Sequence, residues 1–111
     1  LQIFVLNGGE AMLIVLAKAK VGDGALEAAR EAIAAMVEAS NAEEGCIEYS
    51  FTVDVLDPGV LRIVEKWRDE AALAAHFATP HMAAFGKAIA GLDVEIIEAT
   101  KYEAGEGAPV M

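Results

Sequence analysis

The sequence has a single cysteine, few basic residues and no long apolar run, and each of these absences excludes a class of protein. One cysteine, Cys46, cannot form an intrachain disulfide, so the sequence favours a reducing compartment and we expect a cytoplasmic protein. Eight lysines and arginines against eighteen acidic residues give a net charge of −10 at pH 7. Because the basic residues are also scattered, we expect binding to neither nucleic acid nor an anionic membrane surface.

Apolar runs are short, although the chain as a whole is apolar. The longest unbroken run covers residues 11–17, whereas a membrane-spanning helix needs about 20 apolar residues. Residues 1–10 lack the basic start and the small-residue cleavage site of a signal peptide. A hydrophobic content of 56% with 23% charged residues, over 111 residues, predicts one folded domain with a substantial core.

The periodicity of apolar residues predicts a strand and then an amphipathic helix in the first part of the chain. A continuous apolar run that passes into alternation predicts a strand over residues 12–20, covered on both faces at its start. Apolar positions at helical spacing predict a helix over residues 25–39, with Asp23 as its N-cap. Gly45 follows the helix, and a glycine there is free to adopt a left-handed backbone.

A hairpin is predicted next. Clean alternation over residues 46–53 indicates a strand with Ile47 and Tyr49 on its inward face. The sequence Asp-Pro-Gly at residues 57–59 marks a turn, after which residues 60–67 return as the neighbouring strand.

Two helical segments and a last strand complete the chain. Arg68 or Asp69 opens a helix, and Thr79 as N-cap with Pro80 at the first helical position restarts it. The last strand is expected at residues 94–102.

The predicted order of elements, βαββαβ, is that of an α+β, ferredoxin-like fold: an antiparallel sheet with its helices on one face. The opposite face would expose apolar side chains of the first strand together with Val60, Val64 and either Ile96 or Ile97. A broad apolar face is uncommon on soluble monomers. We therefore expect a homodimer that packs sheet face against sheet face.

The domain boundaries follow from the same pattern. Met12 begins the first well-formed strand, so residues 1–11 are expected to be a tag-derived or upstream extension, although residues 3–6 could still pair as an edge strand. The folded domain is expected to span residues 12–103. Residues 104–111, rich in glycine and alanine, are expected to form a flexible tail.

Two stretches of the chain resemble a known family. Residues 44–49 have the sequence Glu-Gly-Cys-Ile-Glu-Tyr, and residues 65–82 contain Glu-Lys-Trp, a histidine nine residues further on, and then Thr-Pro-His. This pattern resembles the antibiotic biosynthesis monooxygenase family, and within it the small quinol monooxygenase-like branch. The resemblance covers about residues 12–102.

The resemblance implies a dimeric α+β barrel with a pocket between the sheet and the helices of each subunit. It also implies that O₂ oxidises a small aromatic phenol or quinol without metal, flavin or haem. The deprotonated substrate itself supplies the electrons in such chemistry. The protein then needs a base, an apolar cavity and a group that stabilises developing negative charge.

Three residues are the candidate catalytic set. We expect His76 to act as base or hydrogen-bond donor, because imidazole titrates near neutral pH. Trp67 would hold the plane of the substrate ring, and Glu65, on the same strand face, would fix the tautomer of the imidazole. The alternative reading is structural: Trp67 is a core side chain, His76 binds a nearby carboxylate or carbonyl, and Glu65 is partnered by His76 or Arg62.

The candidate substrate-binding set surrounds these three residues in the sequence. Core packing is the competing interpretation for Tyr49, and solvent exposure for His81. The set is Tyr49, Phe77, His81, Met82 and Phe85.

No metal site is expected from the sequence. His76 and His81 are five residues apart with a proline between them, not the four that place two ligands on one helical face, and no third ligand is obvious. Haem-degrading relatives place an asparagine on the first strand, whereas this strand offers only Lys18 and Lys20 as polar groups. Haem degradation is therefore not expected.

Two further functions stay open at this stage. The same pocket could hold or sense a small hydrophobic ligand without catalysis, and the missing asparagine favours that alternative. The dimer could also be a structural or protective protein with a vestigial pocket.

Overall fold

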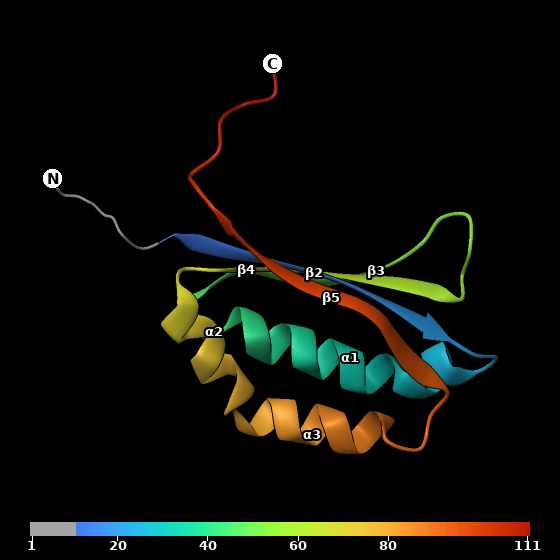
Figure 1. Cartoon of the computed structure of the whole chain (residues 1–111). Helices are drawn as coiled ribbons and strands as arrows, with labels where there is room; N and C mark the ends of the chain where they lie inside the picture. The colour runs from blue at the N-terminus through green and yellow to red at the C-terminus, as the bar shows by residue number, and fades with distance from the viewer. Residues whose placement is uncertain (1–10) are drawn as a thin grey trace, which may run out of the picture.

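Residues 11–111 form a four-stranded antiparallel sheet that lies against their helices, all of which cover one of its faces (Figure 1). The computed structural model describes residues 11–111. The edge strand considered for residues 3–6, and nearly all of the expected extension, lie outside the described residues. The elements are β2 Met12–Val21, α1 Ala25–Asn41, β3 Cys46–Val53, β4 Val60–Trp67, α2 Glu70–Phe77, α3 Pro80–Ile89 and β5 Val94–Ala104.

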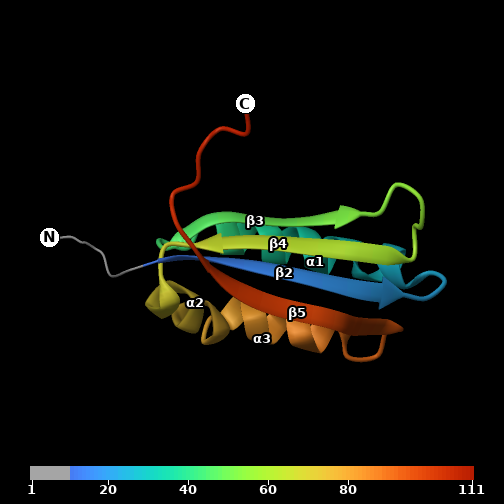
Figure 2. The same ribbon diagram turned by 45° about the horizontal axis from the view of Figure 1, so that its top comes forward.

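The strand order is β3-β4-β2-β5, and every neighbouring pair is antiparallel (Figure 2). The two βαβ crossovers place β2 and β4 in the centre of the sheet. This is the ferredoxin-like βαββαβ arrangement, so the predicted fold class is confirmed. Within residues 11–111, no helix is long and apolar enough to cross a membrane.

Local capping explains where the helices begin. The side chain of Asp69 accepts a hydrogen bond from the backbone at the third position of α2, and Thr79 does the same for α3, with Pro80 following it. The cap predicted at Thr79 is confirmed, and of the two residues considered for the start of α2, Asp69 is the one that caps it. Asp23 as the N-cap of α1 is wrong, because Gly24 occupies the cap position with φ 78 and no side-chain cap is formed.

A bulge at the start of β3 changes which side chains face inward. The pairing of β3 with β4 shifts between Cys46 and Glu48, so Ile47 is the extra residue. Cys46 consequently packs against the core together with Tyr49, while Ile47 is 56% exposed. The inward position predicted for Ile47 is therefore wrong.

The core lies between the sheet and the helices. β4 sends Leu61, Ile63 and Trp67 inward, as its alternation predicts, and Trp67 is fully buried. Leu13 of β2 and Met36 of α1 pack against this row. Burying a large apolar side chain contributes about 1.5–3 kcal/mol, so the region around the end of β4 is a firmly held part of the domain.

The uncovered sheet face is apolar over only part of its area. Leu16 pairs with Val64 on one side and Thr100 on the other, and Leu16 is 43% exposed. Further along the same face β2 presents Lys18, which pairs with Arg62 of β4. Of the residues predicted for this face, Ile96 belongs on the other side, because it pairs with the buried Ala19 and lines a cleft under the helices.

Candidate active site

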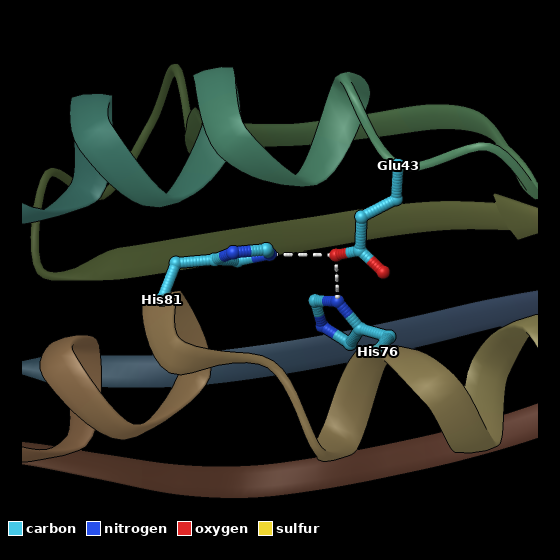
Figure 3. A group of neighbouring side chains, drawn as sticks. All are labelled: Glu43, His76 and His81. Carbon is cyan, nitrogen blue, oxygen red and sulfur yellow. Dashed lines mark hydrogen bonds and ion pairs between the residues drawn. The ribbon is translucent and has the colours of Figure 1, made fainter.

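Three side chains meet between the end of α1 and the neighbouring helices α2 and α3 (Figure 3). Glu43 follows α1, His76 lies in the last turn of α2 and His81 in the first turn of α3. Oε2 of Glu43 is 2.7 Å from Nδ1 of His76 and 2.6 Å from Nε2 of His81. Because an ionised carboxylate only accepts hydrogen bonds, each of these ring nitrogens carries a hydrogen.

The three side chains differ in exposure. The side chain of His76 is 2% exposed, that of Glu43 is 14% exposed and that of His81 is 23% exposed. His76 therefore forms the buried end of the cluster, and His81 lies at its solvent side. Engagement of Nδ1 by Glu43 leaves Nε2 as the nitrogen through which His76 can exchange a proton with a ligand.

A close backbone approach holds Glu43 beside α2. A Cβ added to Gly45 would lie 2.3 Å from the Cβ of Ala72, so only glycine allows α2 to pack this closely on the turn before β3. The carbonyl of Gly45 also accepts a hydrogen bond from the backbone of Arg68 at 2.8 Å. The left-handed backbone considered for Gly45 is not adopted, since among residues 11–111 only Gly24 and Gly107 are glycines with positive φ.

Aromatic rings enclose His76. Its ring centroid is 4.6 Å from that of Trp67, 5.5 Å from that of Tyr49 and 5.8 Å from that of Phe77. Trp67 and Tyr49 meet edge to face at 6.4 Å. Phe77 covers the outer side and is 63% exposed. His76 thus lies among aromatic faces of the kind that can hold a planar ring.

Glu65 is partnered by Trp67 rather than by a histidine. Nε1 of Trp67 donates to Oε1 of Glu65 at 2.8 Å. The partners expected from the sequence are wrong: His76 donates to Glu43, and Arg62 pairs with Asp54. The role of fixing the imidazole tautomer accordingly falls to Glu43. Sequence reasoning missed this residue, although it directly precedes the Glu-Gly-Cys stretch that carries the family resemblance.

Burial raises the pKa values of several acidic groups near the cluster. It raises the pKa of the Glu65 carboxyl, while the hydrogen bond from Trp67 acts in the opposite direction. Burial, together with the charges of Glu43 and Glu65, raises the pKa of the Cys46 thiol to about 11. The pKa of Tyr49 is raised by the same causes. Cys46 is therefore a thiol at neutral pH and unsuited to act as a nucleophile.

An apolar cleft lies between the sheet and the helices α1 and α3, and none of the three cluster residues lines it. It contains ≈ 390 Å³ of space, part of it open to solvent. Among its lining residues, Phe51 has its ring centroid 6.0 Å from that of Tyr49 and 5.9 Å from that of Phe85. All lining residues are apolar: Ala19, Val21, Leu26, Ala29, Ile33, Phe51, Leu61, Ile63, Phe85, Ile89, Val94 and Ile96.

The structure thus divides the predicted site residues into groups. One group surrounds His76, and Phe85 belongs to the separate apolar cleft. Met82 packs against the core. The group around His76 consists of Glu65, Trp67, Tyr49, His81 and the largely exposed Phe77.

The chain matches a family model and several known proteins. Residues 12–88 match the family model described as "Antibiotic biosynthesis monooxygenase". Probable quinol monooxygenase YgiN of Escherichia coli K12 is 32% identical over 90 residues, which cover 72% of this chain and 86% of that protein. An uncharacterized protein of Synechocystis, sll1783, is 43% identical over 49 residues, or 44% of this chain, and the match spans only 33% of that relative's length.

The fold is also found among solved structures. A conserved protein of unknown function from Bacteroides thetaiotaomicron has a TM-score of 0.78 with 30% sequence identity. The match covers 86% of this chain and 99% of that one.

Proposed function

Since the chain belongs to the antibiotic biosynthesis monooxygenase family, we propose that it oxidises a small aromatic phenol or quinol with O₂ and without a cofactor. The observation that carries this proposal is the environment of the His76 ring. Its ring is buried between Trp67 and Tyr49, and its Nδ1 is held by a carboxylate. A positioned imidazole among aromatic faces is what deprotonation of a phenol requires.

Glu43 prepares His76 for this role. By accepting from Nδ1–H, it places the lone pair of the neutral ring on Nε2, which can then take the phenolic proton. The imidazolium that results is stabilised by the adjacent carboxylate. Glu43 thus selects the tautomer and stabilises the charged form, which is the relation that a carboxylate has to histidine in hydrolytic triads.

The electrons come from the substrate in this proposal. A quinol that reacts with one O₂ to give a hydroxyquinone and one water gains one oxygen atom on the ring and loses four electrons, so no external reductant is needed. Deprotonation raises the electron density of the ring. Trp67 and Tyr49 hold its plane, and the all-apolar cleft accommodates O₂ and the unreactive part of an apolar substrate.

A homodimer is part of the proposal. The sheet face opposite the helices presents Ile14, Leu16 and Val64 together with Tyr102, which is 50% exposed. A second copy packed on this face would cover these side chains, as in the dimeric barrel that the family resemblance implies.

The test is oxygen uptake with a panel of quinols and hydroxylated aromatic compounds in the presence of a chelator. Uptake that scales with protein concentration, with one oxygen atom of labelled O₂ in the product, is the expected result. Tight binding of a quinol without any oxygen uptake would instead establish the non-catalytic ligand-binding domain, which the wholly apolar lining of the cleft favours.

A further inference from the structure

The cluster of Glu43, His76 and His81 has the composition of a metal site. Each residue offers one ligand atom, and the three atoms lie within 4.8 Å of one another. Figure 3 shows both imidazole rings directed at the same carboxylate. The sequence predicts no metal site, because the two histidines do not have the four-residue spacing of ligands on one helical face and no third ligand is obvious. The fold supplies the third ligand from Glu43, 33 positions before His76.

We propose that this cluster binds a divalent transition-metal cation through Nδ1 of His76, Nε2 of His81 and a carboxylate oxygen of Glu43. The second half of the proposal rests on the proposed function: the bound cation prevents His76 from acting as a base.

The donor set selects the class of cation. Two imidazole nitrogens and one carboxylate oxygen suit Zn²⁺ and its neighbours in the first transition row, whereas Mg²⁺ and Ca²⁺ prefer oxygen ligands alone. Three protein ligands leave at least one coordination position for water. The solvent side of the cluster, at the 23% exposed side chain of His81, gives that water and the cation a way in.

Binding requires the ligand atoms to rearrange. Metal–ligand bonds of about 2.0–2.1 Å in a tetrahedral site place ligand atoms about 3.3 Å apart. The carboxylate oxygen is now 2.7 Å and 2.6 Å from the two nitrogens, so these two separations must grow by about 0.6 Å. The two nitrogens lie within 4.8 Å of each other and must approach by up to about 1.5 Å. His81, in the first turn of α3 and partly exposed, can supply much of this movement.

The buried ligand is already oriented. The ring of His76 lies against Trp67, with centroids 4.6 Å apart, and the carbonyl of His76 accepts a hydrogen bond from Oγ1 of Thr79 at 2.8 Å. Groups that fix the direction of a ligand ring raise metal affinity because less ordering remains to be done on binding.

Metal binding and base catalysis exclude each other at His76. In the metal-free cluster Nδ1 carries the hydrogen and Nε2 has the lone pair. A cation bound to Nδ1 uses the lone pair of that nitrogen, so the hydrogen of the neutral ring moves to Nε2. The loaded protein then presents a donor where the reaction needs an acceptor, and the cation acts as an inhibitor.

The binding experiment uses the full chain without an added polyhistidine tag, after treatment with a chelator to remove metal. The protein then competes with a chromophoric chelator for Zn²⁺. We expect one Zn²⁺ per chain and a rise in Tm on addition of Zn²⁺. Glu43→Gln and His81→Ala should each weaken the affinity by at least about 10–100-fold, the cost of losing even an outer partner of a metal ligand. Glu44→Gln, which neutralises the adjacent and 94% exposed carboxylate, is the matched control and should bind as the wild type does. Equal affinities for Glu43→Gln and Glu44→Gln would overturn the site.

A second arm titrates Zn²⁺ into the oxygen-uptake assay without chelator. Turnover should fall in step with occupancy measured in the first arm, and the residual rate of Glu43→Gln should not respond to the same Zn²⁺ concentrations. Turnover that is unchanged or raised at full occupancy would overturn the inhibitory role. Zn²⁺ binding in a protein that oxidises no quinol would refute the proposed function but leave the metal site standing, whereas quinol oxidation without Zn²⁺ binding would do the reverse.

Discussion

Glu43 and His76 are 33 positions apart in the chain, yet Oε2 of the carboxylate lies 2.7 Å from Nδ1 of the imidazole. The contact joins the turn after α1 to the last turn of α2, and within residues 11–111 it is the hydrogen bond that the His76 ring, in a residue only 1% exposed, makes to a side chain. The protonation and orientation of the candidate base therefore depend on a residue outside its own helix.

The first prediction concerns this contact. Glu43→Gln keeps the shape of the side chain but removes the charge that stabilises an imidazolium at His76. We expect kcat for quinol oxidation to fall by about 10², the lower end of what acid–base catalysis contributes, with little change in fold. Steady-state oxygen uptake and a circular dichroism spectrum check the two expectations, with Glu44→Gln as the control. An unchanged kcat would mean that Glu43 does not prepare the base.

The second prediction separates the two histidines. His76→Ala should lower kcat/KM by about 10²–10⁴, because it removes the proposed base. His81→Ala should have a smaller effect, since His81 contacts the same carboxylate from its solvent side. Both variants are compared at equal folded fraction, which a melting curve of each establishes. Equal losses in the two variants would contradict the assignment of the base to His76.

The third prediction concerns pH. Burial raises the pKa of Glu65 above 4.5, its ordinary value, so the folded state favours the protonated carboxyl. The stability that Glu65 contributes is therefore fully present below pH 4.5 and is lost as the pH rises through the raised value. Glu65→Gln, which can still accept from Trp67, should match the wild type in acid and exceed it in Tm at pH 7.

Thermal melts of the wild type and Glu65→Gln from pH 4 to pH 8 measure this difference. A Glu65→Gln variant whose Tm at pH 7 is no higher than that of the wild type would show that the buried carboxylate is stabilised by contacts stronger than its desolvation cost.

The fourth prediction tests the close approach at Gly45. Gly45→Ala places a methyl group 2.3 Å from the Cβ of Ala72 and should destabilise the fold by about 1–3 kcal/mol, as overpacking does. Ala72→Gly alone costs about 1 kcal/mol of helix propensity. The double variant should be more stable than the sum of the two single changes, because the added methyl occupies the space that the other change opens. Strict additivity in chemical denaturation would exclude a direct contact.

The fifth prediction concerns assembly. Leu16 lies between Val64 and Thr100 on the uncovered sheet face, so Leu16→Asp should turn the proposed dimer into a monomer without disturbing the core. Val55→Asp, at a position that is 96% exposed in the β3–β4 loop, is the control and should stay dimeric. Light scattering at micromolar concentration measures both. A wild type that is already monomeric would end the proposal.

Sequence patterns predict much of the fold because the interactions behind them join residues that are close in the sequence. Asp69 and Thr79 cap their helices through bonds to backbone only three residues away, and the alternation of β4 places Trp67 inward because a strand has a period of two. The order of such elements, with the handedness of their crossovers, is enough to give the sheet.

Features that depend on distant residues were missed. Neither the bulge at Ile47 nor the partnership of Glu43 with both histidines has a signal in its own segment, since each exists only when β4, α2 and α3 are in place. Glu65 shows a different limit. Its face could be predicted from parity, but parity does not say which of several neighbouring side chains becomes its partner, and that partner is Trp67, two residues away on the same strand.

Both edges of the sheet formed by residues 11–111 are irregular. β3 bulges at Ile47, and the pairing of β5 with β2 shifts where Glu98 and Ile96 flank an extra Ile97. A foreign strand that added to either edge would lose its hydrogen-bond register at the irregularity, which is one way in which sheet proteins resist fibrous aggregation. The broad face has no such obstacle, and contact between two identical faces closes on itself. A dimer of the proposed kind would therefore be finite and not open-ended.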